Sequence, residues 1–229
     1  MMRLLLFDID GTLIRTSGIG RQVMRLALEQ VVGSAGQIES YPFAGKTDLG
    51  IISDLLREIG LSDDEICRYL PDVYAQMAEM GKTLFYLNGL SPCTGILDLI
   101  SQIGQRTDMM IGLQTGNIQP TAHLKLDAAG LDVTSFLIGA FGSDSAKREE
   151  LIPLAMERAF KVSGKQPQLT EVIVIGDTPS DINCAKANGV KSIAVATGSY
   201  SSITLTQYDP DFLLDDLSDT SAVIDLMLE

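Results

Sequence analysis

The sequence predicts an α/β fold in which a doubly wound parallel β-sheet is interrupted, after its first strand, by an inserted helical domain. Residues 2–7 are continuous in apolar side chains, as expected for a strand of a parallel sheet that is covered on both faces. Residues 17–81 show helical patterns and no clear strand. From about residue 90 onward, strand and helix patterns alternate, which is typical of such a sheet.

The helical stretch is expected to contain helices over residues 20–32 and 48–59 and a further helix that begins after Ser62. Ser62 and Glu65 have the spacing of a capping box, in which each side chain accepts from a backbone amide of the other residue. Pro71 is expected to kink or split this last helix, because proline has no N–H group and its ring crowds the preceding turn.

The alternating part of the chain gives one expected element after another. In order, these are a helix over residues 95–103, a strand over 109–113, a helix over 120–129, a strand over 136–139, a helix over 149–162, a strand over 172–175, a helix opened by Ser180 and ended at Gly189, strands over 192–195 and 212–214, and a C-terminal helix. Ligands of such sheets bind beyond the carboxyl ends of the strands, so polar residues at those ends are candidates for a functional site.

Composition narrows the possible functions. The 229 residues have a net charge of −13, so the chain as a whole repels nucleic acids and anionic membranes, and we expect neither as a partner. No run reaches the roughly 18 apolar residues of a membrane span, and Asp8 and Asp10 interrupt the apolar start before it resembles a secretory signal. The three cysteines lack metal-type spacing and are expected to be reduced thiols of a cytoplasmic protein.

Two carboxylates, Asp8 and Asp10, follow the first strand and precede Gly11 and Thr12. Carboxylates at positions i and i+2 repel each other, so this pair needs a cation or a proton. A turn that leaves the strand at Gly11 is one interpretation. The chemical interpretation makes Asp8 a nucleophile that forms an aspartyl phosphate. It makes Asp10 a general acid toward the leaving oxygen and then a base toward water.

A second group of polar residues, Thr115, Gly116 and Asn117, follows the strand over residues 109–113. The Thr115 hydroxyl and the unobstructed Gly116 amide are suitable donors to phosphate oxygens, although a simple turn at a strand end uses the same residue types. We therefore predict phosphate binding here only in combination with the carboxylates.

A third group, Asp177 and Asp181, follows the strand over residues 172–175. Asp181 alone is explained by its position in the first turn of a helix, where the helix dipole favours an acid. Because Asp8 and Asp177 end neighbouring strands, a metal site is the better explanation. Hard oxygen ligands favour Mg²⁺, so we predict Mg²⁺ at Asp8, Asp10, Asp177 and Asp181.

A basic pair, Lys147 and Arg148, lies between the second and third groups. A cation is needed to balance Asp8 and an incoming phosphate. An exposed helix start is the alternative, but two cations are unfavourable at a helix N-terminus. Both residues are therefore candidate phosphate ligands.

The ordered set resembles the haloacid dehalogenase-like hydrolase superfamily, and most of all its phosphoglycolate phosphatase-like branch. The resemblance rests on Asp8-x-Asp10-Gly11-Thr12, on Thr115-Gly116-Asn117, on a basic residue, on Gly176-Asp177 with Asp181 four residues later, and on the pattern from Lys125-Leu126 to Gly130-Leu131. It implies a Rossmann-like core of residues 1–15 and 87–229 with an α-helical cap domain of residues 16–86. It also implies that Mg²⁺ is held by Asp8, the Asp10 backbone carbonyl and Asp177.

The sequence departs from this branch at the basic position, where the branch usually has a Lys-Pro pair. Arg148 is favoured because the residues that follow it resemble a variant of the branch in which arginine has this role, and Lys147 stays open. Within the implied cap, Lys46 and Thr47 belong to a loop that resembles the one facing the core site, although Thr47 or Asp48 also suits a helix N-cap.

Asp10 distinguishes the reaction types of the family. Resembling dehalogenases and phosphonate-cleaving relatives lack this acid, whereas cleavage of a phosphate ester needs it. We therefore predict a Mg²⁺-dependent phosphatase that acts on a small phosphorylated metabolite. A sugar-phosphate phosphomutase is the alternative, and a non-catalytic phosphoacceptor or binding protein is the alternative from another class. The sequence does not identify the substrate or the oligomeric state.

Overall fold

A six-stranded sheet forms the centre of the molecule, in a computed structural model that describes residues 2–229. In spatial order its strands are β5 (Ile138–Ala140), β4 (Met109–Gln114), β1 (Arg3–Phe7), β6 (Val172–Gly176), β7 (Lys191–Val195) and β8 (Phe212–Leu214). Every neighbouring pair is parallel. The predicted parallel α/β sheet is therefore confirmed.

Both faces of the sheet are buried, which explains why its strands are continuous in apolar residues. Leu4 and Leu6 of β1 pack with α6 (Leu151–Ser163) and α7 (Pro179–Asn188). Leu5 and Phe7 point to the opposite face, where α4 (Ile96–Gly104), α5 (Gln119–Ala128) and α9 (Thr220–Leu228) lie. Side chains of one strand alternate between faces, so a single apolar run supplies both layers of the core.

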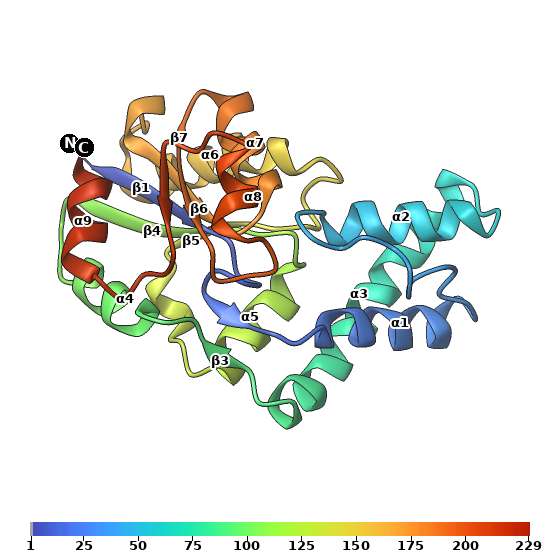
Figure 1. Ribbon diagram of the computed structural model, residues 1–229. Coiled ribbons are helices and arrows are strands. Elements are labelled where there is room, and N and C mark those ends of the chain that lie inside the picture. Colours follow the sequence, from blue (N-terminus) through green and yellow to red (C-terminus); the bar gives the residue numbers. More distant parts are fainter. Residues whose placement is uncertain (1) are drawn as a thin grey trace.

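Three helices leave the sheet region as a group: α1 (Ile19–Val31), α2 (Asp48–Glu58) and α3 (Asp63–Leu87). The chain departs through β2 (Ile14–Arg15) and returns through β3 (Ser91–Pro92), and these short strands pair antiparallel. Figure 1 shows the three helices together on the side of the sheet away from the two chain ends. Helix α3 contacts α1, α2 and also α5, so the helical group is packed against the sheet layer.

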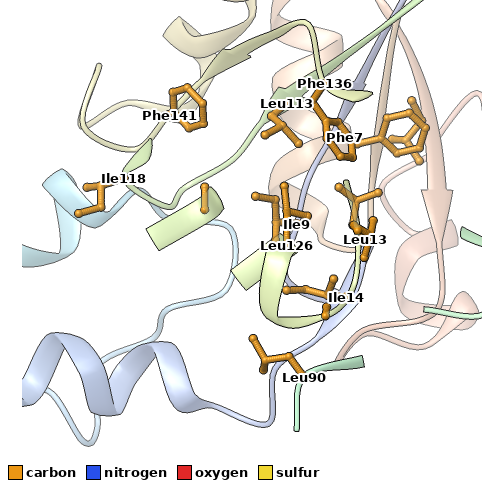
Figure 2. Packing of buried hydrophobic residues seen from close by; sticks show 14 of the residues in the cluster. Phe7, Ile9, Leu13, Ile14, Leu90, Leu113, Ile118, Leu126, Phe136 and Phe141 are labelled. Atoms are coloured by element: carbon orange, nitrogen blue, oxygen red, sulfur yellow. The ribbon is translucent and has the colours of Figure 1, made fainter. Parts of the chain in front are cut away.

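The turn between β1 and β2 is anchored by apolar side chains. Ile9, Leu13 and Ile14 are completely buried. Figure 2 shows them gathered with Leu126 of α5 below the end of β1. This packing fixes the backbone on both sides of Asp10, so the carboxylates that follow β1 have little positional freedom.

Some local predictions need correction. Helix α3 is one continuous helix across Pro71 rather than two. Pro71 lies on the exposed side of α3, where the carbonyl that loses its hydrogen bond can face water. The N-cap of α7 is Thr178 rather than Ser180, because the Thr178 hydroxyl accepts from the Asp181 amide.

Several short elements were not predicted. They are the paired strands β2 and β3, helix α8 (Ser202–Thr206) and three 3₁₀ turns, η1 (Val133–Ser135), η2 (Arg148–Glu150) and η3 (Leu169–Glu171). Across residues 2–229, none of the helices combines the length and apolar character needed to cross a membrane.

Candidate active site

A cavity of about 670 Å³ lies between the carboxyl ends of the strands and the α1–α3 helices. Most of the predicted site residues line it: Asp8, Asp10, Lys46, Gly116, Asn117, Arg148 and Asp177. The helical group also contributes Arg21, Met77 and Phe85, and Arg15 of β2 and Lys125 of α5 complete this part of the lining. Residues that are more than a hundred positions apart in the sequence therefore meet at one site.

Asp8 directly extends β1, because its backbone amide donates to the Ile175 carbonyl of β6 at 2.9 Å. Its side chain is 5% exposed, and one carboxylate oxygen lies 3.1 Å from the Arg148 guanidinium. Burial raises the pKa of Asp8 from 3.8 to about 6, against the lowering effect of Arg148 and with further raising by Asp181 and Asp10. Asp8 is thus a buried carboxylate whose charge needs a further cation.

Asp8, Asp177 and Asp181 form a compact cluster in which one carboxylate oxygen from each lies within 4.8 Å of the others. Burial, followed by the charges of Asp8 and Asp181, raises the pKa of Asp177 well above its usual value. Thr12 donates to Asp177 at 3.0 Å. Three hard oxygen donors with mutual repulsion fit a divalent cation such as Mg²⁺.

Asp181 has a different environment from the other two carboxylates. One of its oxygens accepts from Arg148 at 2.6 Å, and the other accepts from the Thr178 hydroxyl at 2.7 Å and amide at 3.1 Å. Both oxygens are therefore engaged, whereas Asp177 has one oxygen beside Thr12 and the other beside Gly11 and Gly198. A Cβ on Gly198 would lie 1.7 Å from that second oxygen, so any other residue there would displace the Asp177 carboxylate.

The basic pair is divided by the structure. Arg148 is 6% exposed, lies at the start of η2 and joins Asp8 to Asp181 through one guanidinium nitrogen, Nη2. Nη1 lies beside Gly116. Lys147 instead points to solvent with 70% of its side chain exposed, 3.7 Å from Glu150, and it does not line the cavity. Lys147 was predicted as a second candidate phosphate ligand, and this is corrected. Of the two basic residues, Arg148 turns into the cavity and Lys147, which precedes η2, turns to solvent.

The Asp10 carboxylate accepts hydrogen bonds from Asn117 and from Lys125 of α5. The Lys125 ammonium donates to both of its carboxylate oxygens, at 2.7 and 2.8 Å, and Asn117 Nδ2 donates at 2.5 Å. Burial raises the pKa of Asp10, but Lys125 and then Asn117 outweigh it and leave the pKa below its usual value. About a third of the Asp10 side chain remains exposed toward the cavity.

Lys125 is the functional candidate that the sequence did not assign. It was noted as part of a family-like pattern, but its helical position gave no sign that it pairs with Asp10, 115 residues earlier. A lysine in the middle of a helix is usually a solvated residue. The available signal was its spacing of eight residues from Asn117, which places both on the same side of α5 and its N-terminal turn.

Thr115 and Gly116 do not both open onto the cavity. Thr115 is completely buried, and its hydroxyl oxygen accepts from the Asn117 amide at 3.3 Å and from Asn117 Nδ2 at 2.9 Å. Gly116 does line the cavity, and a Cβ there would lie 2.0 Å from the Lys46 carbonyl oxygen. Glycine is thus required at 116 because the loop before α2 packs directly on it.

The start of α2 is hydrogen-bonded to the sheet region at several points. The Asp48 amide donates to the Gly116 carbonyl at 2.7 Å, and the Asp48 carboxylate accepts from the Ile118 amide at 2.9 Å. Thr47 donates to the Ala146 carbonyl at 3.0 Å and is the N-cap of α2, as predicted. Together these contacts, which we name the α2 latch, hold the helical group over the cavity.

Lys46 lines the cavity, but its ammonium group is held by neighbours in the helical group. It donates to the Tyr41 hydroxyl at 2.6 Å and lies 3.7 Å from Asp54. Arg21 stacks over the Phe43 ring at 4.2 Å on the same wall. The part of the lining that the helical group contributes thus combines the cationic Arg21 and Lys46 with the buried apolar side chains of Met77 and Phe85.

The chain is similar to known proteins over most of its length. The family model of the haloacid dehalogenase-like hydrolases matches residues 5–195. Pyrophosphatase PpaX of Bacillus pumilus is 26% identical over 96% of this chain and 94% of its own length. Phosphoglycolate phosphatase of Pectobacterium atrosepticum is 24% identical over 97% and 92%, respectively.

Among solved structures, CbbY of Rhodobacter sphaeroides, in complex with xylulose-(1,5)-bisphosphate, aligns with a TM-score of 0.71 at 19% identity. The alignment covers 96% of each chain. At this identity the likeness supports the fold alone, and it extends over the helical group as well as the sheet.

Proposed function

The chain belongs to the haloacid dehalogenase-like hydrolase family, and we propose that it is a Mg²⁺-dependent phosphatase that hydrolyses a small phosphate monoester through an aspartyl phosphate on Asp8. The observation that carries this proposal is the position of Asp8. It is a buried carboxylate at the end of the central strand, beside Arg148 and in one cavity with Asp10 and Asp177. The relatives described above, named pyrophosphatase PpaX and phosphoglycolate phosphatase, support this proposal.

In the first step, an oxygen of Asp8 attacks phosphorus and the bond to the leaving oxygen breaks. Asp10 donates a proton to that oxygen, so the product leaves as an alcohol. Arg148 Nη1 and the Gly116 amide are placed to donate to the phosphoryl oxygens, and donors of this kind stabilise charge that develops in the transition state. Thr115 acts behind this site, since its buried hydroxyl oxygen orients Asn117, which in turn donates to Asp10.

In the second step, Asp10 accepts a proton from a water molecule that attacks the phosphorus of the aspartyl phosphate. The bond between Asp8 and phosphorus breaks, and inorganic phosphate and the free carboxylate are formed. Lys125 and Asn117 keep Asp10 beside the cavity in both steps.

The residues that would hold Mg²⁺ are Asp8, Asp177 and the backbone carbonyl of Asp10. Asp181 supports the site through Arg148 and Thr178. When bound, Mg²⁺ would neutralise charge on the carboxylates and on the phosphate. The raised pKa values of Asp8 and Asp177 support this assignment, since two carboxylates with unfavourable charges are stabilised by a cation.

We assign residues 16–86 as a cap that selects the substrate. Arg21 and Lys46 of this segment line the cavity, together with Arg15 of β2. In a chain of net charge −13, these side chains favour a substrate with an anionic group beyond its reacting phosphate. The printed names of the relatives, phosphoglycolate phosphatase and pyrophosphatase, fit a small substrate of this kind.

The test is hydrolysis of 4-nitrophenyl phosphate by the purified chain with and without Mg²⁺. We expect Mg²⁺-dependent release of phosphate, and a loss of about a thousandfold or more in Asp8→Asn, because an amide is a poor nucleophile. Asp72→Asn, an exposed acid on α3, is the matched control and should retain wild-type activity. Isotopically labelled water should place its oxygen in the released phosphate. Full activity in Asp8→Asn, or rearrangement of a sugar phosphate without label uptake, would contradict a phosphatase.

A further inference from the structure

Lys125 is a buried cation that the proposed reaction uses only indirectly. Its side chain is 4% exposed, although it lies on the edge of the cavity. An ammonium group has three N–H donors, and three acceptors surround this one: the two carboxylate oxygens of Asp10 and Asn117 Oδ1 at 2.6 Å. The donors of Lys125 are thereby fully used by the side chains around Asp10.

The Lys125 ammonium group is enclosed by residues of two helices of the helical group. The Phe85 ring of α3 lies 5.7 Å from its nitrogen, and a Cβ on Gly20 of α1 would lie 3.1 Å from it. Helices α1 and α3 therefore cover the ammonium group from the side of the helical group. Asp48 is a further buried carboxyl group close enough for the charge of Lys125 to lower its pKa, although burial raises that pKa overall.

Asp10, by contrast, has few other restraints. Lys125 donates two hydrogen bonds to it and Asn117 donates one, the Thr16 side chain adds a further contact, and Asn117 is itself oriented by Lys125 and Thr115. Removing Lys125 would leave a partly exposed carboxylate that can rotate about its side-chain bonds. Proton transfer requires the acid within about 2.6–3.2 Å of the reacting oxygen, so such rotation costs rate.

We propose that Lys125 is a positioning residue, which together with Asn117 fixes the direction of the Asp10 carboxyl toward the leaving oxygen. The inference rests on the proposed phosphatase activity. It adds to that activity a residue on α5 that determines how well the enzyme cleaves esters with basic leaving groups. Phosphorus chemistry at Asp8 itself does not need Lys125.

The experiment compares Lys125→Met with wild type on phenyl phosphate and 4-nitrophenyl phosphate, which are similar in size but differ in the basicity of the leaving group. Phenolate is the more basic leaving group, so cleavage of phenyl phosphate depends more strongly on the proton from Asp10 than cleavage of 4-nitrophenyl phosphate does. We compare kcat/KM, because it reports the step that expels the leaving group, whereas hydrolysis of the aspartyl phosphate is common to both esters. We expect kcat/KM to fall about a hundredfold on phenyl phosphate and only about tenfold on 4-nitrophenyl phosphate. Lys82→Met, which removes an exposed lysine of α3, is the control and should change neither.

A double variant separates positioning from general damage. If Lys125 acts through Asp10, then Asp10→Asn combined with Lys125→Met should be no slower on phenyl phosphate than Asp10→Asn alone. Equal losses on both esters, or multiplied losses in the double variant, would overturn the inference. Circular dichroism checks folding. If Lys125→Met does not fold, Lys125→Gln, which retains N–H donors, must show the same selective loss to a smaller degree.

Failure of the proposed function gives a different result. In that case the wild type would hydrolyse neither ester, or Asp8→Asn would be as active as wild type. If Asp8→Asn is inactive while Lys125→Met behaves like Lys82→Met, the phosphatase assignment stands and only the role of Lys125 is wrong.

Discussion

Arg148 and Lys147 are neighbours in the sequence, but only Arg148 is buried beside Asp8. We therefore expect substitutions of the two residues to have very different effects on activity. Arg148→Lys should lower kcat/KM for 4-nitrophenyl phosphate by about a hundredfold, because an ammonium group cannot contact Asp8, Asp181 and a phosphate with the planar geometry of a guanidinium. Lys147→Met should stay within about twofold of wild type, since its side chain is exposed and outside the cavity. Steady-state kinetics of the two variants measure this, and a larger loss in Lys147→Met would reverse the assignment.

Lys46 tests whether the cap recognises the distal part of the substrate. Lys46→Ala should reduce kcat/KM for a substrate with a second anionic group by about tenfold, which corresponds to about 1.4 kcal/mol. Turnover of 4-nitrophenyl phosphate should fall less, since it has no such group. The contacts of Lys46 with Tyr41 and Asp54 mean that the ammonium must turn from these partners to bind substrate. If neither substrate is affected, Lys46 serves only the helical group.

Sequence patterns predicted which polar residues lie together when each of them directly follows a strand. Asp8, Asp177 and Gly116 lie at strand ends, and the parallel order of β4, β1 and β6 brings such ends together. Sequence patterns did not predict that Lys125 is a partner of Asp10. Lys125 belongs to helix α5, and only the packing of that helix against the end of β1 brings the two side chains together. Nor could these patterns separate Lys147 from Arg148, since the direction of each side chain depends on a 3₁₀ turn of three residues.

At the level of elements, the prediction was accurate for strands and less so for helix ends. The β-branched strand over residues 172–175 and the apolar first strand were found within one or two residues. The continuity of α3 across Pro71, where a kink or a split was predicted, has a physical origin. Local sequence indicates the cost of proline in a helix, but burial of Val73, Met77 and Phe85 on the other side of α3 offsets that cost.

The α2 latch gives a prediction about a whole element. Gly116→Ala should push the loop before α2 away, because the added Cβ would lie 2.0 Å from the Lys46 carbonyl oxygen and would disturb the bond from the Asp48 amide. We expect KM to rise about tenfold or more and amide hydrogen exchange at the start of α2 to become faster. Gly104→Ala is the matched control, since a Cβ there has open space. Unchanged exchange at residues 46–50 in Gly116→Ala would contradict a latch.

For the molecule as a whole, the buried carboxylates make stability depend on pH and Mg²⁺ together. The folded pKa values of Asp8 and Asp48 are raised to about 6, so the folded state binds more protons than the unfolded state between about pH 4 and 6. Stability without metal is therefore expected to fall as pH rises through 6. A pKa raised from 3.8 to about 6 corresponds to a cost of about 3 kcal/mol for the ionised form.

Thermal unfolding at pH 5 and pH 8, with chelator or with Mg²⁺, measures this linkage. Mg²⁺ should raise Tm by about 5–10 °C at pH 8 and much less at pH 5, where protons compete for the same carboxylates. Asp177→Asn should lose most of the Mg²⁺ effect while unfolding cooperatively. A Mg²⁺ shift of equal size at both pH values, or one retained in Asp177→Asn, would place the metal elsewhere.

The pairing of β2 with β3 has a consequence for how such enzymes diversify. The chain leaves the sheet region at Ile14–Arg15 and re-enters at Ser91–Pro92, and these four residues are hydrogen-bonded side by side. An insertion whose two ends already touch can be lengthened, replaced or exchanged between relatives without moving any strand of the sheet. Such a gene could change what its product recognises through one contiguous stretch of coding sequence, while the carboxylates that perform the chemistry are inherited unaltered on either side of it.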